Sequence, residues 1–186
     1  LMSGRLGAVP LAAVAIGGNY VALFYLGGLG MLMAMSPTVA HVYGAGRTQD
    51  VGGYFRQALW LSQAIAAVVL AALLCAGPVL HAIGTPPEVA DLATRYIHAV
   101  AFGIPAMFAF LALRFSSEGI GWTRPILFTA VISLAANIAL NWVFMYGKLG
   151  APALGAVGTG VATACVHWLV FGFMWLYVQR HRAYAE

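Results

Sequence analysis

Residues 133–144 read SLAANIALNWVF, an apolar stretch that contains two asparagines. It is apolar enough to lie in hydrocarbon, yet Asn137 and Asn141 bring two carboxamides to one helix face, because residues four apart share a face. A hydrogen-bonding side chain is costly in a bilayer unless it finds a partner. The pair therefore indicates either a bridge to a neighbouring helix or a polar site within the membrane.

The composition is that of an integral membrane protein. Of 186 residues, 62% are hydrophobic and 8% are charged, and the mean hydropathy is +0.89. A soluble domain carries about 25% charged residues, so this chain lacks the polar side chains that a water-facing surface needs. Its nine Lys and Arg residues are scattered and do not alternate with aromatic residues, which argues against a nucleic acid partner.

The apolar runs are each long enough to cross a hydrocarbon core of about 30 Å as a helix. Five spans are expected, at about residues 9–35, 57–80, 96–119, 125–146 and 156–179. The runs lack the alternation of barrel strands, and an open sheet edge cannot be satisfied in lipid. The expected fold class is therefore an all-α membrane protein. Glycines in the first and last spans should let helix backbones approach closely, namely Gly27, Gly28, Gly30, Gly155, Gly158 and Gly160.

Basic residues predict the orientation, because cytoplasmic loops carry an excess of Lys and Arg. Six lie on one predicted side, namely Arg47, Arg56, Arg114, Arg124, Arg180 and Arg182. Three lie on the other, namely Arg5, Arg95 and Lys148. The loops around Arg47, Arg124 and Arg180 are therefore predicted to face the cytoplasm.

The remaining polar residues give no sign of an enzyme. Gln63 and His167, each alone in an apolar run, are expected to bridge helices. Glu118 follows Arg114 by four residues, so an ion pair at the membrane interface is expected. No HEXXH or GXSXG motif occurs, and no two histidines have metal-ligand spacing on one helix, so neither catalysis nor a bound metal is predicted. No carboxylate lies at mid-membrane, although a cation-coupled transporter normally needs one.

Longer blocks of sequence resemble the multidrug and toxic-compound extrusion (MATE) family, in its NorM-like branch. The blocks are SEGIGWTRPI at 117–126, NWVFMYGKLGAPALGAVGTGVATA at 141–164, MSGRLGAVPLAAVAIG at 2–17 and HVYGAGR at 41–47. The resemblance implies twelve helices in two lobes of six. The chain would then supply the end of helix one and helices two to six of the amino-terminal lobe, and the carboxy-terminal lobe would be its partner.

The resemblance also implies a role for the two amides. NorM-like members carry an Asp in helix one, within a VDT-like motif that would end just before Leu1. Asn137 and Asn141 match the two positions of a polar cluster on helix five that this Asp faces. Another branch has Asp at the second position, so Asn141 here favours the NorM-like assignment. The two amides are expected to support a carboxylate whose occupancy by Na⁺ or H⁺ drives transport, with no other cofactor.

The function implied is secondary antiport in a bacterial inner membrane, with small organic cations and aromatic compounds as substrates. Weak candidates for lining a substrate cavity are Tyr20, Phe24, Phe110 and Trp142. One alternative is a flippase for lipid-linked sugars, which would need basic residues in its cavity. Another is a structural membrane bundle without transport activity.

Overall fold

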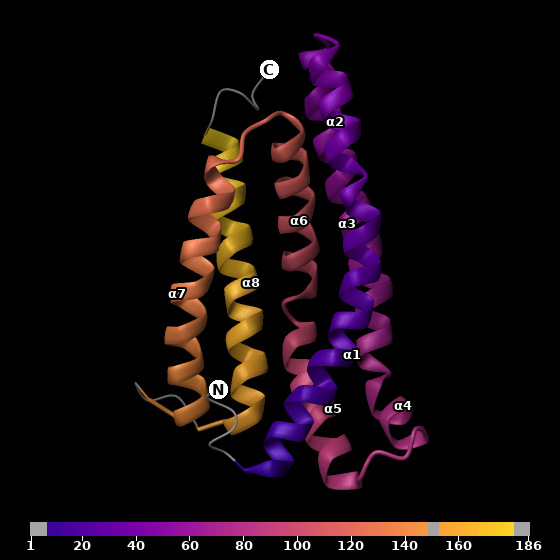
Figure 1. Ribbon diagram of the computed structural model, residues 1–186, viewed down its shortest axis with the longest axis vertical. Coiled ribbons are helices and arrows are strands. Elements are labelled where there is room, and N and C mark those ends of the chain that lie inside the picture. Colours follow the sequence, from indigo (N-terminus) through magenta and orange to yellow (C-terminus); the bar gives the residue numbers. More distant parts are fainter. Residues whose placement is uncertain (1–6, 149–152, 181–186) are drawn as a thin grey trace.

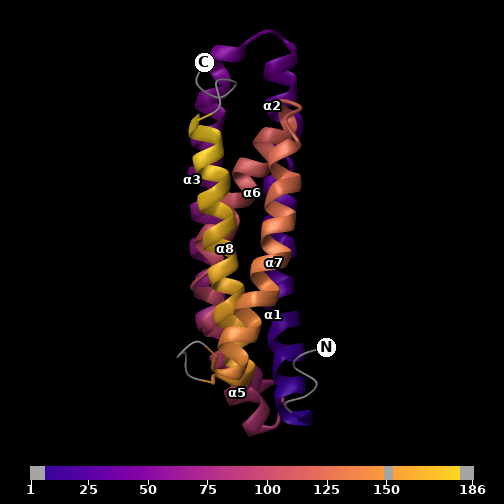
Figure 2. The same ribbon diagram turned by 90° about the vertical axis from the view of Figure 1, so that its left-hand side faces the viewer.

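The computed structural model describes residues 7–148 and 153–180, and all regular structure in these two ranges is helical. The helices are α1 (Ala8–Met33), α2 (Met35–Gly44), α3 (Thr48–Leu74), α4 (Ala76–Ala82), α5 (Pro87–Ala101), α6 (Ile104–Gly119), α7 (Arg124–Tyr146) and α8 (Gly155–Arg180). They form an elongated, flattened bundle that is broad in Figure 1 and narrow in Figure 2. The all-α membrane fold predicted from the sequence is confirmed.

Among the described residues, four helical segments are long enough and apolar enough to span a bilayer. They are Ala8–Gly44, Thr48–Leu74, Arg124–Tyr146 and Gly155–Arg180. A fifth crossing results when α5 and α6 are taken together, although the pair is bent by 48°. The sequence predicted a single span at 96–119 and so missed both this bend and the first turns of α5. Those turns carry exposed charged side chains on one face, which hid them from a search for apolar runs.

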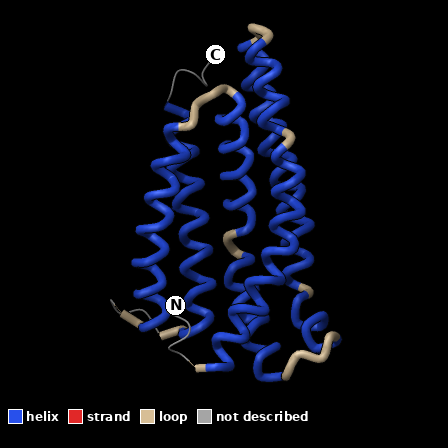
Figure 3. Tube along the Cα trace, viewed as in Figure 1, coloured by secondary structure: helices blue, strands red, loops and turns tan. Residues whose placement is uncertain are grey.

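Proline sets the position of three helix ends. Because Pro has no N–H, the carbonyl four residues before it loses its helical partner, and the helix is interrupted near that point. Each end falls four residues before a proline: Met33 before Pro37, Leu74 before Pro78 and Ala101 before Pro105. Figure 3 shows the resulting short loops within the bundle as well as those at its ends.

Side chains from other helices stabilise the bend between α5 and α6. Nε1 of Trp168 on α8 donates to the carbonyl of Phe102 at 3.1 Å, and Nε2 of Gln63 on α3 donates to the carbonyl of Pro105 at 3.2 Å. Gly103 at the bend lies against the backbone of α8. A Cβ added to Gly103 would come within 2.7 Å of the Cα atom of Ala164. The helix-bridging role expected of Gln63 is confirmed.

Close helix contacts surround the core, where α1, α3, α5 and α6 meet. Phe108 of α6 is fully buried there, and a Cβ at Gly28 of α1 would overlap its ring. The expected close approach is confirmed at Gly28, Gly158 and Gly160, whereas a Cβ would meet open space at Gly27, Gly30 and Gly155.

The basic loops gather at one end of the bundle. The α2–α3 turn, the α6–α7 connection and the end of α8 all lie at the top of Figure 1. Arg47, Arg124 and Arg180 lie at these three places. The sequence analysis had assigned all three to one side of the membrane, and the structure puts them at one end of the bundle. Arg5 and Arg182 lie outside the described residues. That this end is the cytoplasmic one stays a prediction.

We expect Gly28→Ala to destabilise the bundle, because the added methyl would push into the ring of buried Phe108. Overpacking of this kind costs about 1–3 kcal/mol. Gly27→Ala is the matched control, since its Cβ meets open space and Ala favours a helix by up to about 1 kcal/mol over Gly. Unfolding in mixed micelles would measure both. Equal stabilities of the two variants would contradict this packing.

We expect Trp168→Phe to loosen the α5–α6 bend, because it keeps an aromatic ring but removes the N–H that pairs with the Phe102 carbonyl. Interhelical hydrogen bonds in membranes are worth about 0.6–1.7 kcal/mol, and the same unfolding assay should show a loss in this range. Trp60→Phe is the control, because Trp60 is 79% exposed. A loss as large in the control would show that the indole bond is unimportant.

Candidate functional site

A cavity of about 240 Å³ lies between α1, α6, α7 and α8. Its apolar wall comes mainly from α6 and includes Met107, Phe110 and Leu111. Its polar groups come from all four helices, namely Tyr25, Arg114, Thr129, Ser133 and His167. Ligand pockets usually measure about 300–1,000 Å³, so this cavity suits a small group or one part of a larger ligand.

One polar stripe of α7 links the cavity to the asparagine pair. Thr129, Ser133, Asn137 and Asn141 recur every four residues, a spacing that keeps successive side chains on neighbouring faces of the helix. Thr129 and Ser133 line the cavity, and the two asparagines continue the stripe over the next two turns. The asparagines themselves do not border the cavity, which ends at Ser133 on this helix.

The two asparagines interact with each other. Nδ2 of Asn141 donates to the backbone carbonyl of Asn137 at 2.8 Å and to Oδ1 of Asn137 at 3.0 Å. Both residues are half-buried. The pair thereby uses one amide as donor and the other as acceptor, and each retains hydrogen-bonding capacity. Within the described residues no other helix contributes a hydrogen bond to them, so the pair is available to a ligand or to a further polar side chain.

The charges near the cavity are paired. Nε of Arg114 lies 2.9 Å from Oε1 of Glu118, and the guanidinium also lies 5.7 Å from the centre of the Phe115 ring. The ion pair predicted from the spacing is confirmed. Arg114 nevertheless lines the cavity, where the sequence had placed it only near the end of a span.

His167 contacts a neighbouring helix segment, as expected, and also borders the cavity. From α8 its Nδ1 packs against the α5–α6 bend at Gly103, a contact between helices, and the side chain also stands in the cavity wall. That nitrogen has no well-oriented hydrogen-bond partner in the described part of the chain. No sequence spacing marks His167 as a cavity residue, because the bend that brings α6 to it is a tertiary feature.

The four aromatic candidates are spread over the bundle. Phe110 lines the cavity. The hydroxyl of Tyr20 donates to the carbonyl of Ala72 on α3 at 3.1 Å, and the ring of Phe24 packs against that of Tyr20, with centres 5.2 Å apart and planes inclined by 59°. Trp142 is 47% exposed. The structure thus brings only Phe110 of this set to the cavity, and their part in binding a substrate stays a prediction.

Sequence reasoning missed Thr129 and Ser133 as cavity residues, although a signal was present. Polar residues at strict four-residue spacing in an otherwise apolar helix mark one continuous face. The sequence analysis predicted a shared face only for Asn137 and Asn141, and Thr129 and Ser133 extend the same four-residue spacing toward the start of α7.

Comparison with known proteins agrees with this architecture. The MatE family model matches residues 1–143. Over 177 residues the chain is 41% identical to the multidrug resistance protein NorM of Aliivibrio fischeri, covering 95% of this chain and 38% of that protein. It is 38% identical to the multidrug resistance protein MdtK of Yersinia pestis over 184 residues, covering 98% of this chain and 40% of that one.

Solved structures show the same fold. The eukaryotic MATE transporter AtDTX14 superposes with a TM-score of 0.91 at 19% identity, over 99% of this chain and 40% of that one. An outward-facing multidrug resistance MATE transporter of the MOP superfamily gives a TM-score of 0.83 at 23% identity, over 98% and 40%. The chain thus spans about two fifths of the length of these relatives. By the family match over most of its residues and by its fold, the chain belongs to the MatE family.

Proposed function

We propose that the chain works as part of a secondary multidrug antiporter, which exports cationic or aromatic compounds in exchange for Na⁺ or H⁺. Membership of the MatE family and the likeness to two multidrug resistance proteins support this function. The proposal places the chain in a bacterial inner membrane, with the arginine-rich end in the cytoplasm. It also pairs the chain with a second, carboxy-terminal lobe.

The observation that carries the proposal is the position of the asparagine pair. Asn137 and Asn141 bond to each other, remain half-buried and extend the polar stripe of the cavity. Amides in this arrangement can hydrogen-bond a carboxylate offered by another helix, and the strength of those bonds depends on whether the carboxylate is charged. Binding of Na⁺ or H⁺ to the carboxylate then favours one helix packing over another, which is the requirement for alternating access.

The substrate would lie along the same cavity wall. Phe110 offers an aromatic surface to a flat ring, and the hydroxyls of Thr129 and Ser133 offer hydrogen bonds. The other aromatic candidates, Tyr20, Phe24 and Trp142, do not border this cavity, so they would contact a substrate only if it also lay against other surfaces of the bundle. A cationic substrate also needs a carboxylate, and the proposal assigns that charge to the partner lobe or to the coupling site.

One observation favours a second candidate. Arg114 in the cavity wall suits an anionic group, as a flippase for lipid-linked sugars would require. Glu118 pairs with this arginine, however, so the local charge is largely balanced. Multidrug export therefore remains the better proposal.

We expect Asn137→Ala combined with Asn141→Ala, introduced into the complete coding sequence that contains this chain, to abolish drug resistance while the protein still reaches the membrane. The reason is that the coupling carboxylate would lose both amides. Growth of an efflux-deficient bacterial strain on an aromatic cation measures resistance, and a membrane blot measures expression.

The matched control is Leu134→Ala combined with Ile138→Ala. These residues neighbour the asparagines on α7 but are 65% and 54% exposed, away from the polar stripe. Resistance should survive this change. The proposal would be wrong if the asparagine variant grew as well as the wild type, or if both double variants failed alike.

We expect drug efflux from vesicles to stop when the Na⁺ and pH gradients are both removed, and to return when one of them is restored. The gradient that restores efflux identifies the coupling ion. In a single Asn141→Ala variant, half-maximal efflux should need a higher concentration of that ion, because the supporting amide is gone. Efflux that continues without either gradient would exclude antiport.

A further inference from the structure

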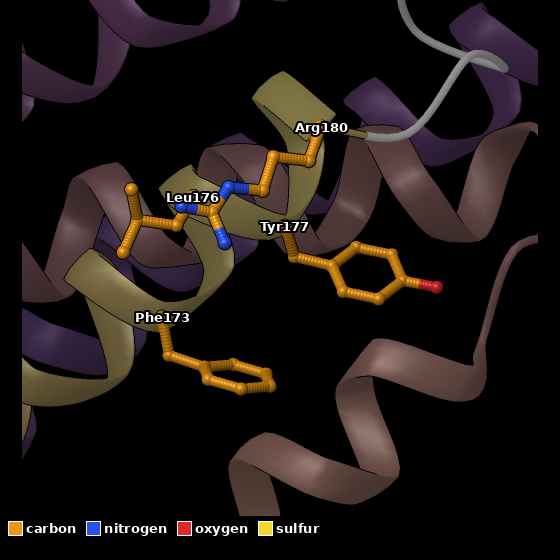
Figure 4. Close-up of a pocket in the computed structure, with 4 residues that line it drawn as sticks. All are labelled: Phe173, Leu176, Tyr177 and Arg180. Atoms are coloured by element: carbon orange, nitrogen blue, oxygen red, sulfur yellow. The ribbon is translucent and has the colours of Figure 1, made fainter.

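A shallow groove opens on the side of α8 near its carboxy-terminal end (Figure 4). It encloses about 280 Å³ and is lined by Phe173, Leu176, Tyr177 and Arg180. Leu176 and Tyr177 lie three and four positions after Phe173 and four and three before Arg180, so the four residues share one side of the last two turns. The groove lies at the arginine-rich end of the bundle and is separate from the cavity described above.

The floor of the groove is aromatic and flat. The rings of Phe173 and Tyr177 are stacked, with centres 6.5 Å apart and planes inclined by 28°. Leu176 is 51% exposed beside them. The Tyr177 hydroxyl accepts a hydrogen bond from Nε1 of Trp122 at 2.8 Å, which fixes the end of α8 to the α6–α7 connection. Tyr and Trp gather where hydrocarbon meets lipid headgroups, so we expect this hydrogen bond to lie at the level of the membrane interface.

Arg180 gives the groove its charge. It belongs to the last turn of α8, and its side chain turns back along the helix toward Leu176 (Figure 4). The guanidinium therefore lies beside apolar surface, and no carboxylate is among the four lining residues. An arginine that lies over apolar surface at the interface is well placed to bind a phosphate group in two-point fashion.

The surroundings add to the positive charge. Five arginines of the described chain belong to the helix turns nearest this end, namely Arg47, Arg56, Arg114, Arg124 and Arg180. The acidic residues Asp50 and Glu118 each pair with one of them, Arg47 and Arg114 respectively. Arg124 begins α7, the helix that packs beside α8. The charge that remains would attract an anionic membrane surface at about 1 kcal/mol per basic residue.

We propose that this groove binds one anionic phospholipid, with its phosphate on Arg180 and the start of an acyl chain against Phe173 and Leu176. Three features lead to this ligand: an apolar aromatic floor, a cation at its rim that pairs with no carboxylate within residues 7–148 and 153–180, and an expected position at the membrane interface. A free anion would bind Arg180 but would make no contact with the apolar floor of the groove. A zwitterionic lipid would contact the apolar floor, but the positive charge of its headgroup would be repelled by Arg180.

The site is independent of the proposed antiport. It shares no residue with the cavity or with the asparagine pair, so a lipid here would hold the end of α8 at the interface whatever the protein transports. Its test uses the chain of 186 residues, purified in detergent, and needs no transport assay.

Phosphatidylglycerol and phosphatidylcholine with identical acyl chains would be titrated into the purified chain, and bound lipids counted by native mass spectrometry. We expect phosphatidylglycerol to bind more tightly. Arg180→Gln should lower the affinity for phosphatidylglycerol about fivefold, the loss expected for one basic residue at a membrane surface. The affinity for phosphatidylcholine should stay unchanged. Arg180→Lys should keep most of the preference, because it keeps the charge.

Arg56→Gln is the matched control for charge. It removes a cation at the same end of the bundle, but Arg56 stands among polar residues of α3 such as Gln49 and Gln57. Leu176→Ser tests the apolar floor of the groove and should lower the affinity for both lipids. Leu134→Ser, on the exposed surface of α7, should change neither affinity. Circular dichroism checks that each variant keeps its helices, and Arg180 and Leu176 are exposed enough for the fold to tolerate both changes.

Three results would overturn the proposal. Equal losses for Arg180→Gln and Arg56→Gln would show diffuse charge attraction without a site. Displacement of the lipid by inorganic phosphate at similar concentration would show an anion site that ignores the acyl chain. Undiminished binding to Arg180→Gln would place the lipid elsewhere.

Discussion

A single constraint shapes this bundle: in hydrocarbon every backbone N–H and C=O group needs a partner within the protein. Helices meet this need along most of their length, but proline withholds one donor wherever it occurs. The chain accepts that loss at Pro37, Pro78 and Pro105, and a helix ends four residues before each. At the break between α5 and α6, where the helices are bent by 48°, Trp168 and Gln63 supply hydrogen bonds to nearby carbonyls.

The same constraint explains how polar side chains are tolerated on α7. Thr129 donates to the carbonyl of Ile126 at 2.8 Å, and Asn141 donates to the carbonyl of Asn137. Each side chain thereby meets part of its hydrogen-bonding need within its own helix. A stripe of polar groups can then persist beside the cavity without a fixed partner, and this makes it suitable for a ligand or an ion that comes and goes.

The α5–α6 bend is a proline break that also contributes to the wall of the cavity. Its lower arm, α5, packs on α1 and α8, while its upper arm, α6, supplies Phe110 and Arg114 to the cavity wall. His167 touches the bend and also borders the cavity. A change in the bend angle would therefore alter the shape of the cavity directly, because no intervening element separates them.

The sequence by itself determined the class of fold, the spans that are apolar throughout, the Arg114–Glu118 pair and the shared face of Asn137 and Asn141. These follow from local rules: hydropathy over a span and the spacing of residues on one helix. The proline positions also lay within reach, since each break is a local consequence of a missing N–H. Only the tertiary structure decided that α5 and α6 form one bent crossing, that Gly28 but not Gly27 meets Phe108, and that Arg114 and His167 line one cavity. These features depend on which helix faces which, and helix pairing arises from contacts between residues far apart in the chain, which spacing along one helix does not encode.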